Sequence, residues 1–465
     1  SPAEVSPHLP GGGAGAGAVA VAATPAPTRS PANARGSGLS DIQKMHGNCP
    51  PLYKEFAVEH TRDNVILVTW ANFHYLDFAL NWANHMRKLG MSNFLIGAMD
   101  AELAAALHSR EIPCFSMGAG LTTGDFGWGS PTFHKMGREK ISLANQFVSF
   151  GLDLLLSDID TVYMKDPTEY MELYPEADIL TSSDHLRWST KDGGLEDPEA
   201  AHSAMNIGIM FFRHGPDTLQ LLNEWDEMIQ KDPKYWDQNA FNDIARKGMQ
   251  HHKHHGGPPD SRYFLGNNGK VKVGILPVSR FSSGHTFFVQ QMYKSIGVEP
   301  YGVHATFQFG GTAGKRNRLR EFGEWFDPPE YYKGKFMSFE FEGIDRTWSD
   351  EGKSDEEMYA KHFEVVRKQL QQLKVAFAIS VSTGRALVIP KLTCYCDRYW
   401  APLEKCRIPG VVMDMPFECP LDHLIEPLHL DLHPDAHGTE LKYREHSFLG
   451  NPRLDPSVLK GKEVG

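Results

Sequence analysis

Two aspartates that follow an apolar run are the residues best suited to chemistry in this sequence. Asp158 and Asp160 come directly after residues 152–157, LDLLLS. The run predicts a buried strand, so both carboxylates fall at its carboxyl end. Carboxylates at this spacing converge where the chain turns, and they can then share a hard cation such as Mn²⁺ or Mg²⁺. Because such a cation stabilises a departing diphosphate, the pair predicts a metal site for a nucleotide-sugar donor.

The same D-x-D string allows two other interpretations. In haloacid-dehalogenase-type phosphatases, Asp158 would be the nucleophile and Asp160 a general acid. That class carries the motif on its first strand and needs a later acidic pair at a strand end. Here two or three strand–helix units precede Asp158, and no such pair follows it. In the second interpretation, both are surface acids that cap a helix near Asp166. The sequence context favours the metal site.

Strands and helices are expected to alternate around the aspartate pair. This order predicts an α/β fold with a parallel, doubly wound sheet, in which ligands bind at the carboxyl ends of the strands. Apolar and β-branched runs predict the strands, and apolar residues at helical spacing predict the helices. The predicted strands cover 65–69, 94–98, 114–115, 152–156, 177–182, 206–212 and 271–276, and the predicted helices cover 75–88, 101–109, 134–150, 217–230 and 237–247.

Composition divides the chain into three parts. Residues 1–45 are rich in Gly, Ala and Pro, which predicts a flexible stem or linker. Residues 46–326 are predicted to form the main domain, in which the histidine-rich stretch 251–259 is a polar loop. After DPPEYY at 327–332, residues 327–465 are predicted to form a smaller α/β subdomain, with a helix at 355–382 and a strand at 386–390.

Bulk composition narrows the classes of function and the compartment. A net charge of -11 over 465 residues does not indicate nucleic-acid binding. No apolar stretch is long enough to span a bilayer. Because the chain begins at Ser1, a cleaved signal or a membrane anchor upstream stays open. Disulfides are favoured over free thiols or zinc for the six cysteines, because C-x-C at 394–396 is too short for a zinc knuckle.

Four sequence blocks in this order resemble the nucleotide-diphospho-sugar transferases of glycosyltransferase family 77. They are LDLLLSDIDTVYMKDP, SAMNIGIMFFR, YWDQNAFNDI and YGVHATFQFGGTAGKRNRLRE. Four later blocks, FDPPEYY, ALVIPKL, CPLDH and REHSFLGNP, resemble the plant and algal extensin arabinosyltransferases. The resemblance implies a GT-A-type single Rossmann-like sheet and retaining transfer from UDP-β-L-arabinofuranose. It also implies a hydroxyproline-rich glycoprotein acceptor and a type II membrane protein of the Golgi lumen, with the anchor outside this chain.

The resemblance also assigns roles to single residues. Asp158, Asp160 and His304 match ligands of Mn²⁺, although a lone histidine is often only packed. Asp237 and Gln238 match a pair near the anomeric carbon, where Asp237 would act as nucleophile or Gln238 by electrostatics; the alternative is a helix cap. Instead of binding the donor, Trp70 could occupy a core position and Lys315 could be a solvated cation. The predicted donor-binding residues are Thr69, Trp70, Asn72, Asp100, Lys140, Ile159, Asp184, Asn206 and Lys315.

The sequence therefore predicts transfer of arabinofuranose to arabinosylated hydroxyproline on extensin-type cell-wall glycoproteins. Xylosyl transfer onto a pectin would use the same donor residues and is the second enzymatic hypothesis. A non-catalytic subunit of a glycosylation complex is the third. Retention of Asp158, Asp160, His304 and Gln238 together argues against the third, because an inactive copy has no need of all four.

Overall fold

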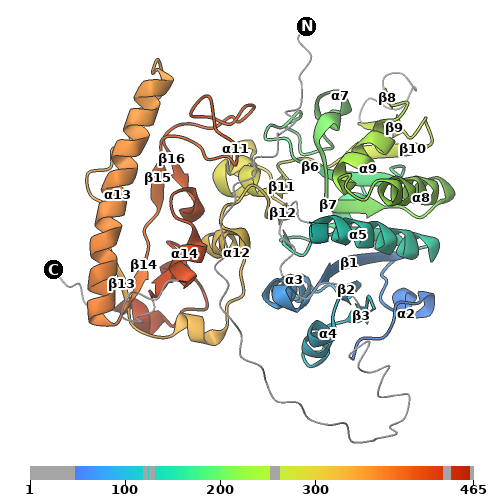
Figure 1. Ribbon diagram of the computed structural model, residues 1–465, viewed down its shortest axis with the longest axis horizontal. Coiled ribbons are helices and arrows are strands. Elements are labelled where there is room, and N and C mark those ends of the chain that lie inside the picture. Colours follow the sequence, from blue (N-terminus) through green and yellow to red (C-terminus); the bar gives the residue numbers. More distant parts are fainter. Residues whose placement is uncertain (1–47, 119–123, 125–130, 252–261, 433–440, 461–465) are drawn as a thin grey trace, which may run out of the picture.

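A mixed sheet is the largest element of the protein. The computed structural model describes residues 48–118, 124, 131–251, 262–432 and 441–460. Within them, one sheet has nine strands in the order β3-β2-β1-β4-β7-β6-β10-β9-β8 (Figure 1). These strands are β1 (Val65–Ala71), β2 (Phe94–Ala98), β3 (Cys114–Ser116), β4 (Asp153–Ser157), β6 (Ile179–Ser183), β7 (Met205–Phe212), β8 (Gln250–His251), β9 (Tyr263–Gly266) and β10 (Val271–Ile275).

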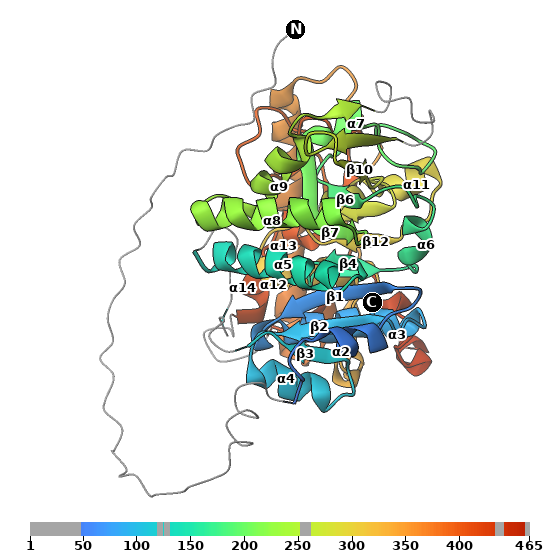
Figure 2. The same cartoon turned by 90° about the vertical axis from the view of Figure 1, so that its right-hand side faces the viewer.

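Side-chain alternation along the strands gives the sheet two buried faces. In β1, Ile66 and Val68 belong to one core cluster and Leu67 and Ala71 to another, as a period of two requires. Helices α5 (Pro131–Ser149), α8 (Pro216–Lys231) and α9 (Asp237–Arg246) contribute to the first cluster, and α3 (Leu76–Lys88) and α4 (Ala101–His108) to the second. Figure 2 shows α5 and α8 lying along the sheet. The predicted α/β class is thus confirmed.

Strand direction differs from the prediction in one part of the sheet. Strands β1, β2, β3 and β4 are parallel to their neighbours within this group, but β7 is antiparallel to both β4 and β6. Between β6 and β7 the chain forms only the short helix α7 (Pro198–Ala201) and a 3₁₀ turn, whereas a parallel return needs a crossover that is usually a longer helix. The start of β7 therefore meets the carboxyl ends of β4 and β6.

A small second sheet connects two distant segments of the chain. Its order is β11 (Phe281–Ser283), β12 (Gly302–His304) and β5 (Thr161–Tyr163). In the antiparallel pairing of β12 with β5, His304 stands opposite Thr161. This register places His304 directly beside the aspartate pair. Helices α6 (Thr168–Met171), α11 (Met292–Ile296) and α12 (Gly311–Glu321) surround this sheet.

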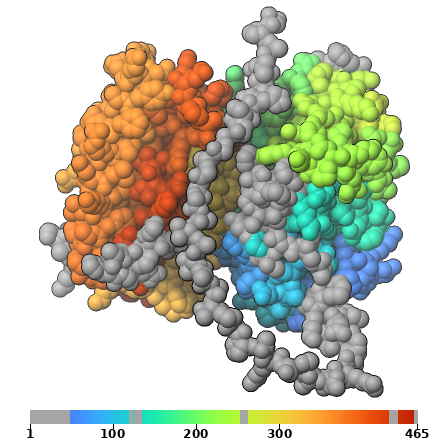
Figure 3. Space-filling model, viewed as in Figure 1, coloured from blue at the N-terminus to red at the C-terminus, as the bar shows by residue number. Residues whose placement is uncertain are grey.

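The C-terminal segments form their own small sheets, beside the main one (Figures 1 and 3). The long helix α13 (Asp355–Thr383) starts with a capping box formed by Ser354 and Glu357. It packs on β14 (Ala386–Val388) and β15 (Leu392–Cys394), so the helix and the strand predicted in this part of the chain are confirmed. The remaining elements are β13 (Phe336–Ser338), β16 (Phe417–Cys419), β17 (Tyr443–Arg444), η5 (Leu421–His423) and α14 (Pro427–Leu432).

All six cysteines form disulfides, as predicted. The pairs are Cys49–Cys114, Cys394–Cys419 and Cys396–Cys406. Such pairing is consistent with an oxidising lumen. Among the residues described above, no helix has the length and apolar content of a membrane span. The stem at 1–45 and most of the polar loop at 251–259 lie outside the described residues.

Candidate active site

A turn after β4 brings the two aspartates together. The Asp158 N–H donates to the carbonyl of Gly208 at 2.9 Å, which ends the strand pairing with β7. The Thr161 N–H then donates to the Asp158 carbonyl at 3.0 Å and closes the turn around Ile159. Asp160 is buried, whereas the side chain of Asp158 is 29% exposed. The chain thus turns at the position where a turn is needed for the two carboxylates to converge.

His304 completes a compact group with both carboxylates. Its Nε2 lies 3.5 Å from Asp158 Oδ2 and 3.4 Å from Asp160 Oδ1. One ligand atom from each of the three residues falls within 4.8 Å of the others, as a shared metal ion would require. Gly208 is needed at its position because a Cβ there would overlap the His304 ring.

Two lysines balance the charge of the two carboxylates. Lys140, from α5, places Nζ 2.6 Å from Asp158 Oδ1 and donates to the Ile207 carbonyl at 3.1 Å. Lys315, from α12, places Nζ 2.6 Å from Asp160 Oδ2. Both lysines were predicted to bind the donor. A bound divalent cation would leave the group with excess positive charge, which suits an anionic diphosphate.

Opposing effects set the protonation of Asp160 and His304. Burial raises the pKa of the Asp160 carboxyl, but Lys315 and His304 outweigh it and hold that pKa well below its usual range. Burial lowers the pKa of His304, but Asp160 and Asp158 outweigh it and raise the net value. Asp160 is therefore ionised at neutral pH. A proton and a cation compete for the Nε2 atom of His304.

The opposite side of the His304 ring fixes its tautomer. Its Nδ1 lies 3.2 Å from Asn206 Oδ1, which also accepts from the Gly208 N–H at 2.8 Å and from Ser182 Oγ at 3.2 Å. Because Asn206 Oδ1 is an acceptor, we assign the proton to Nδ1, which leaves Nε2 facing the carboxylates. Sequence reasoning missed Ser182 and Gly208. Their only signal was their place in segments that also hold Asp184 and Asn206.

A hydrogen-bond chain continues from Asn206 to helix α9. Asn206 Nδ2 donates to Asp184 Oδ1 at 3.0 Å, and Gln238 Nε2 donates to Asp184 Oδ2 at 2.9 Å. Trp236 is the N-cap of α9, so Asp237 and Gln238 are its first two residues. Gly137 of α5 is needed opposite Asp237, because a Cβ there would overlap the Asp237 carboxylate. The predicted residues Asp184, Asn206 and Gln238 thus form one array with His304.

The residues predicted to meet the nucleobase lie at the ends of β1 and β2. Thr69 is fully buried, and Trp70 belongs to the core, where the Lys140 ammonium lies 5.3 Å from its ring centroid. Asn72 Nδ2 donates to the Gly124 carbonyl at 2.8 Å. Asp100 caps α4 by accepting from the Leu103 N–H at 2.7 Å. Their role in donor binding stays a prediction.

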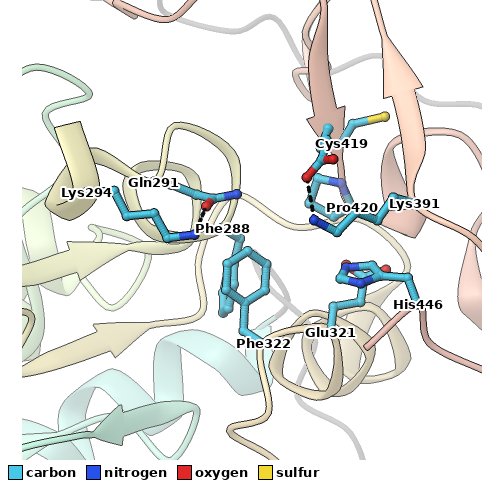
Figure 4. A pocket seen from close by; sticks show the side chains of 10 residues that line it. Phe288, Gln291, Lys294, Glu321, Phe322, Lys391, Cys419, Pro420 and His446 are labelled. Atoms are coloured by element: carbon cyan, nitrogen blue, oxygen red, sulfur yellow. Dashed lines mark hydrogen bonds and ion pairs between the residues drawn. The ribbon is translucent and has the colours of Figure 1, made fainter. Parts of the chain in front are cut away.

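A cavity elsewhere in the molecule is separate from this group. It has a volume of about 160 Å³ and lies between Phe288, Phe322 and the segment around Cys419 (Figure 4). Its charged lining comes from both sides, with Lys294 on one and Lys391 on the other. None of the three predicted metal ligands lines it. The cavity therefore offers no part of the possible metal site, which lies at the group around Asp158.

Comparison with known proteins defines the class of protein. The model of the nucleotide-diphospho-sugar transferase family matches residues 89–319, a range that includes Asp158, Asp160, Gln238 and His304. The chain belongs to the nucleotide-diphospho-sugar transferase family. Its α/β fold and its group of two aspartates and a histidine agree with that assignment.

Individual relatives point to arabinosyltransferases. The chain is 43% identical to arabinosyltransferase XEG113 of Arabidopsis thaliana over 414 residues, which are 88% of this chain and 62% of that protein. It is 22% identical to beta-arabinofuranosyltransferase RAY1 of the same plant, over 41% of this chain and 36% of the relative. The chain thus spans less than two thirds of either relative. Among solved structures, mouse xyloside xylosyltransferase 1 matches 52% of this chain and 98% of its own, with 12% identity and a TM-score of 0.30.

Proposed function

We propose that the protein is a metal-dependent, retaining glycosyltransferase. In this proposal it moves arabinofuranose from UDP-β-L-arabinofuranose to arabinosylated hydroxyproline on extensin-type glycoproteins. The observation that carries the proposal is the convergence of Asp158, Asp160 and His304 at the carboxyl end of β4, flanked by two lysines. The similarity to arabinosyltransferase XEG113 supports arabinose as the sugar, and its plant origin supports a cell-wall acceptor.

The donor set suits Mn²⁺ or Mg²⁺. Two carboxylates and one imidazole are ligands that Mn²⁺ accepts readily, and Mg²⁺ accepts the carboxylates. When bound, the ion offsets the negative charge that builds on the diphosphate as the glycosidic bond breaks. With an ion bound, Lys140 and Lys315 would be available to pair with phosphate oxygens, because both acids would already be neutralised. Metal and diphosphate should therefore bind cooperatively.

The array beyond His304 holds the sugar. Asp184 and Asn206 bind hydroxyl groups of the arabinofuranose, and their mutual hydrogen bond fixes both side chains before the donor arrives. Gln238 is oriented by its bond to Asp184, so its amide is set in place near the anomeric carbon. Retention then arises either from attack by Asp237 followed by a second displacement, or from same-face attack with Gln238 stabilising the oxocarbenium-like state.

The remaining parts of the chain serve this reaction in the cell. We infer that residues 46–326 form the GT-A-type transferase domain and 327–465 a smaller subdomain, with 1–45 as the stem. Thr69, Trp70, Asn72 and Asp100 lie at strand ends where the uracil would bind. The three disulfides support a place in the Golgi lumen.

A donor and acceptor screen tests the proposal. The chain is incubated with a panel of nucleotide sugars and hydroxyproline arabinosides of different length, in Mn²⁺ or in EDTA. We expect UDP release and a product one pentose heavier only with UDP-arabinofuranose and metal, and NMR should show the anomeric configuration of the donor retained. Glu227→Gln, at an exposed carboxylate of α8, is the matched control and should behave as wild type. Turnover that persists in EDTA, or a preference for another sugar, would contradict the proposal.

A further inference from the structure

Three aromatic side chains lie beside the candidate site and have no part in the donor chemistry above. We propose that Phe307, Tyr399 and Trp400 bind the sugar ring of the acceptor, which is a step that rests on the proposed function. The ring centroids of Phe307 and Trp400 are 4.8 Å apart, and those of Tyr399 and Trp400 are 4.3 Å apart. These three residues form an aromatic patch.

The aromatic patch borders the candidate site from two sides. Phe307 follows His304 by three residues and has a φ of 51°, a left-handed conformation that costs free energy for a bulky side chain. Backbone strain of this kind persists where neighbouring contacts impose it, and it gathers at ligand sites. On the other side, Tyr399 packs against the cluster that contains Leu186, two residues after Asp184, and the Asp184 carboxylate adds to burial in raising the pKa of the phenol. The patch therefore adjoins both the metal group and the residues proposed to hold the donor sugar.

Fixed contacts hold the loop that carries Tyr399 and Trp400. The Cys396–Cys406 disulfide closes this loop, and the Asp397 N–H donates to the Cys406 carbonyl at 2.8 Å. The buried Asp397 carboxylate accepts from His285 Nε2 at 2.8 Å, and His285 lies two residues after the end of β11. Trp400 is nevertheless 54% exposed. A large indole held in water by a rigid loop is preorganised for a ligand, because little ordering entropy is left to lose on binding.

A small hydrophobic cluster packs this loop against the segment that carries Asp184. The Leu186 side chain packs with Ile408 and Val411, and Tyr399 lies against the same cluster. The Leu186 carbonyl accepts from Gln290 Nε2 at 2.9 Å. Packed contacts therefore fix how near the patch lies to the segment that carries Asp184.

The chemistry of the patch fits a sugar ring. A saccharide presents C–H groups on its faces, which pack against the electron-rich faces and edges of aromatic rings. It presents hydroxyl groups at its rim, and these can pair with the Tyr399 hydroxyl and the Trp400 N–H. Neither polar group has a hydrogen bond to another residue that the structure describes. Because the reacting atoms must come within about 3–3.5 Å, the ring beside the donor is the one that receives the new bond.

Substitution of Trp400 tests this inference. Trp400→Ala, Trp400→Phe and Phe363→Ala are compared, the last being an exposed aromatic of α13 away from the patch. Acceptor KM is measured with a free arabino-oligosaccharide and with a hydroxyproline arabinoside glycopeptide. Calorimetry gives the Kd of the same oligosaccharide in the presence of UDP and Mn²⁺, and the Kd of UDP alone. We expect KM and Kd for both acceptors to rise about tenfold in Trp400→Ala, as loss of one stacked ring implies, and less than about threefold in Trp400→Phe.

Phe363→Ala should match wild type in every measurement, and UDP should bind all variants equally. An unchanged oligosaccharide Kd in Trp400→Ala would overturn the inference. A loss seen only with the glycopeptide would also overturn it, because the patch would then contact peptide and not sugar. The inference would also be overturned if UDP bound more weakly to Trp400→Ala and equally weakly to Trp400→Phe. If wild type shows no donor turnover but binds the oligosaccharide through Trp400, the proposed function fails, whereas binding of a sugar ring by the patch stands.

Discussion

Helix α12 contributes one cation to each of two acidic clusters. Lys315 pairs with Asp160 in the metal group, and one turn later Arg318 Nε lies 2.9 Å from Asp422 Oδ2 in a second cluster. Both clusters contain two aspartates and at least one histidine. They differ in exposure: in the first, the side chains of Lys315 and Asp158 are 28% and 29% exposed although Asp160 is buried, whereas in the second those of Arg318 and Asp422 are fully buried.

The difference in exposure separates a binding site from a structural clamp. In the buried cluster, Asp422 accepts from Arg318 and from the Phe309 N–H at 2.8 Å, and Asp397 lies between His285 and His423. Each acid therefore has fixed donors, and among the described residues only the exposed cluster has the spacing of a metal site. In that cluster the lysines are flexible ammonium groups that a cation can replace. The same residue types thus allow a cation to replace the lysines in the partly exposed cluster, and they hold the fold together in the buried one.

The largest effect should follow from removing a carboxylate of the exposed cluster. Asp160→Asn should lower kcat for donor turnover about 10⁴-fold, which is roughly 5 kcal/mol of lost charge stabilisation. The fold should persist, because the amide can still occupy the same space. Mn²⁺-dependent UDP release measures the first effect and circular dichroism the second. Asp243→Asn, at an exposed acid of α9, is the control; activity of Asp160→Asn near that control would remove Asp160 from the metal group.

Breaking the buried cluster should instead affect folding. Arg318→Met leaves Asp422 ionised without its partner and should lower the free energy of unfolding by about 3–5 kcal/mol. The double variant Arg318→Met/Asp422→Leu should recover part of the loss, since apolar groups can replace a buried ion pair. Urea denaturation followed by fluorescence measures both. If the double variant is no more stable than the single one, the clamp depends on Asp422 hydrogen bonds and not on charge.

Local patterns account for much of the fold but for little of this contrast. An apolar run such as Leu154–Leu156 predicts a strand because a buried strand leaves its pattern within a few consecutive residues. The turn at Asp158 is predicted by the end of that run. The direction of β7 and the contact of Asn206 with His304 depend on pairings far apart in the chain, which local spacing does not encode. His304 was found only through family resemblance. The CPLDH block contains Asp422, yet nothing in it shows that Arg318 is its partner.

A third test concerns Glu321, the last residue of α12. Burial, and to a lesser extent Asp422, raises the pKa of its carboxyl to about 8. Because the folded value lies above the ordinary 4.5, the stability that this group contributes is complete below pH 4.5 and is lost as the pH rises through about 8. Glu321→Gln should remove this loss and stabilise the protein by on the order of 2–4 kcal/mol at pH 9.

Thermal unfolding of wild type and Glu321→Gln between pH 4 and 9 measures this difference. Glu418→Gln is the control, because Glu418 lines the same cavity as Glu321 but is half exposed and pairs with Lys391. It should follow the wild-type pH profile. If the unfolding temperatures of wild type and Glu321→Gln change with pH in the same way, Glu321 is ionised over the whole pH range. The end of α12 would then be better hydrated than its burial indicates.

The smallest effect on stability should come from Lys315→Met, the counterpart of Arg318→Met on the same helix. Lys315 is partly exposed and His304 still faces Asp160, so its loss should lower the free energy of unfolding by only about 1–2 kcal/mol, less than the loss of Arg318. UDP affinity in Mn²⁺ should nevertheless fall about tenfold, because the ammonium group is proposed to bind a phosphate. Calorimetry and denaturation of both variants give the comparison directly. Lys315→Met could instead lose as much stability as Arg318→Met and bind UDP normally. In that case α12 stabilises both clusters, and Lys315 is a structural partner of Asp160 that a metal ion does not replace.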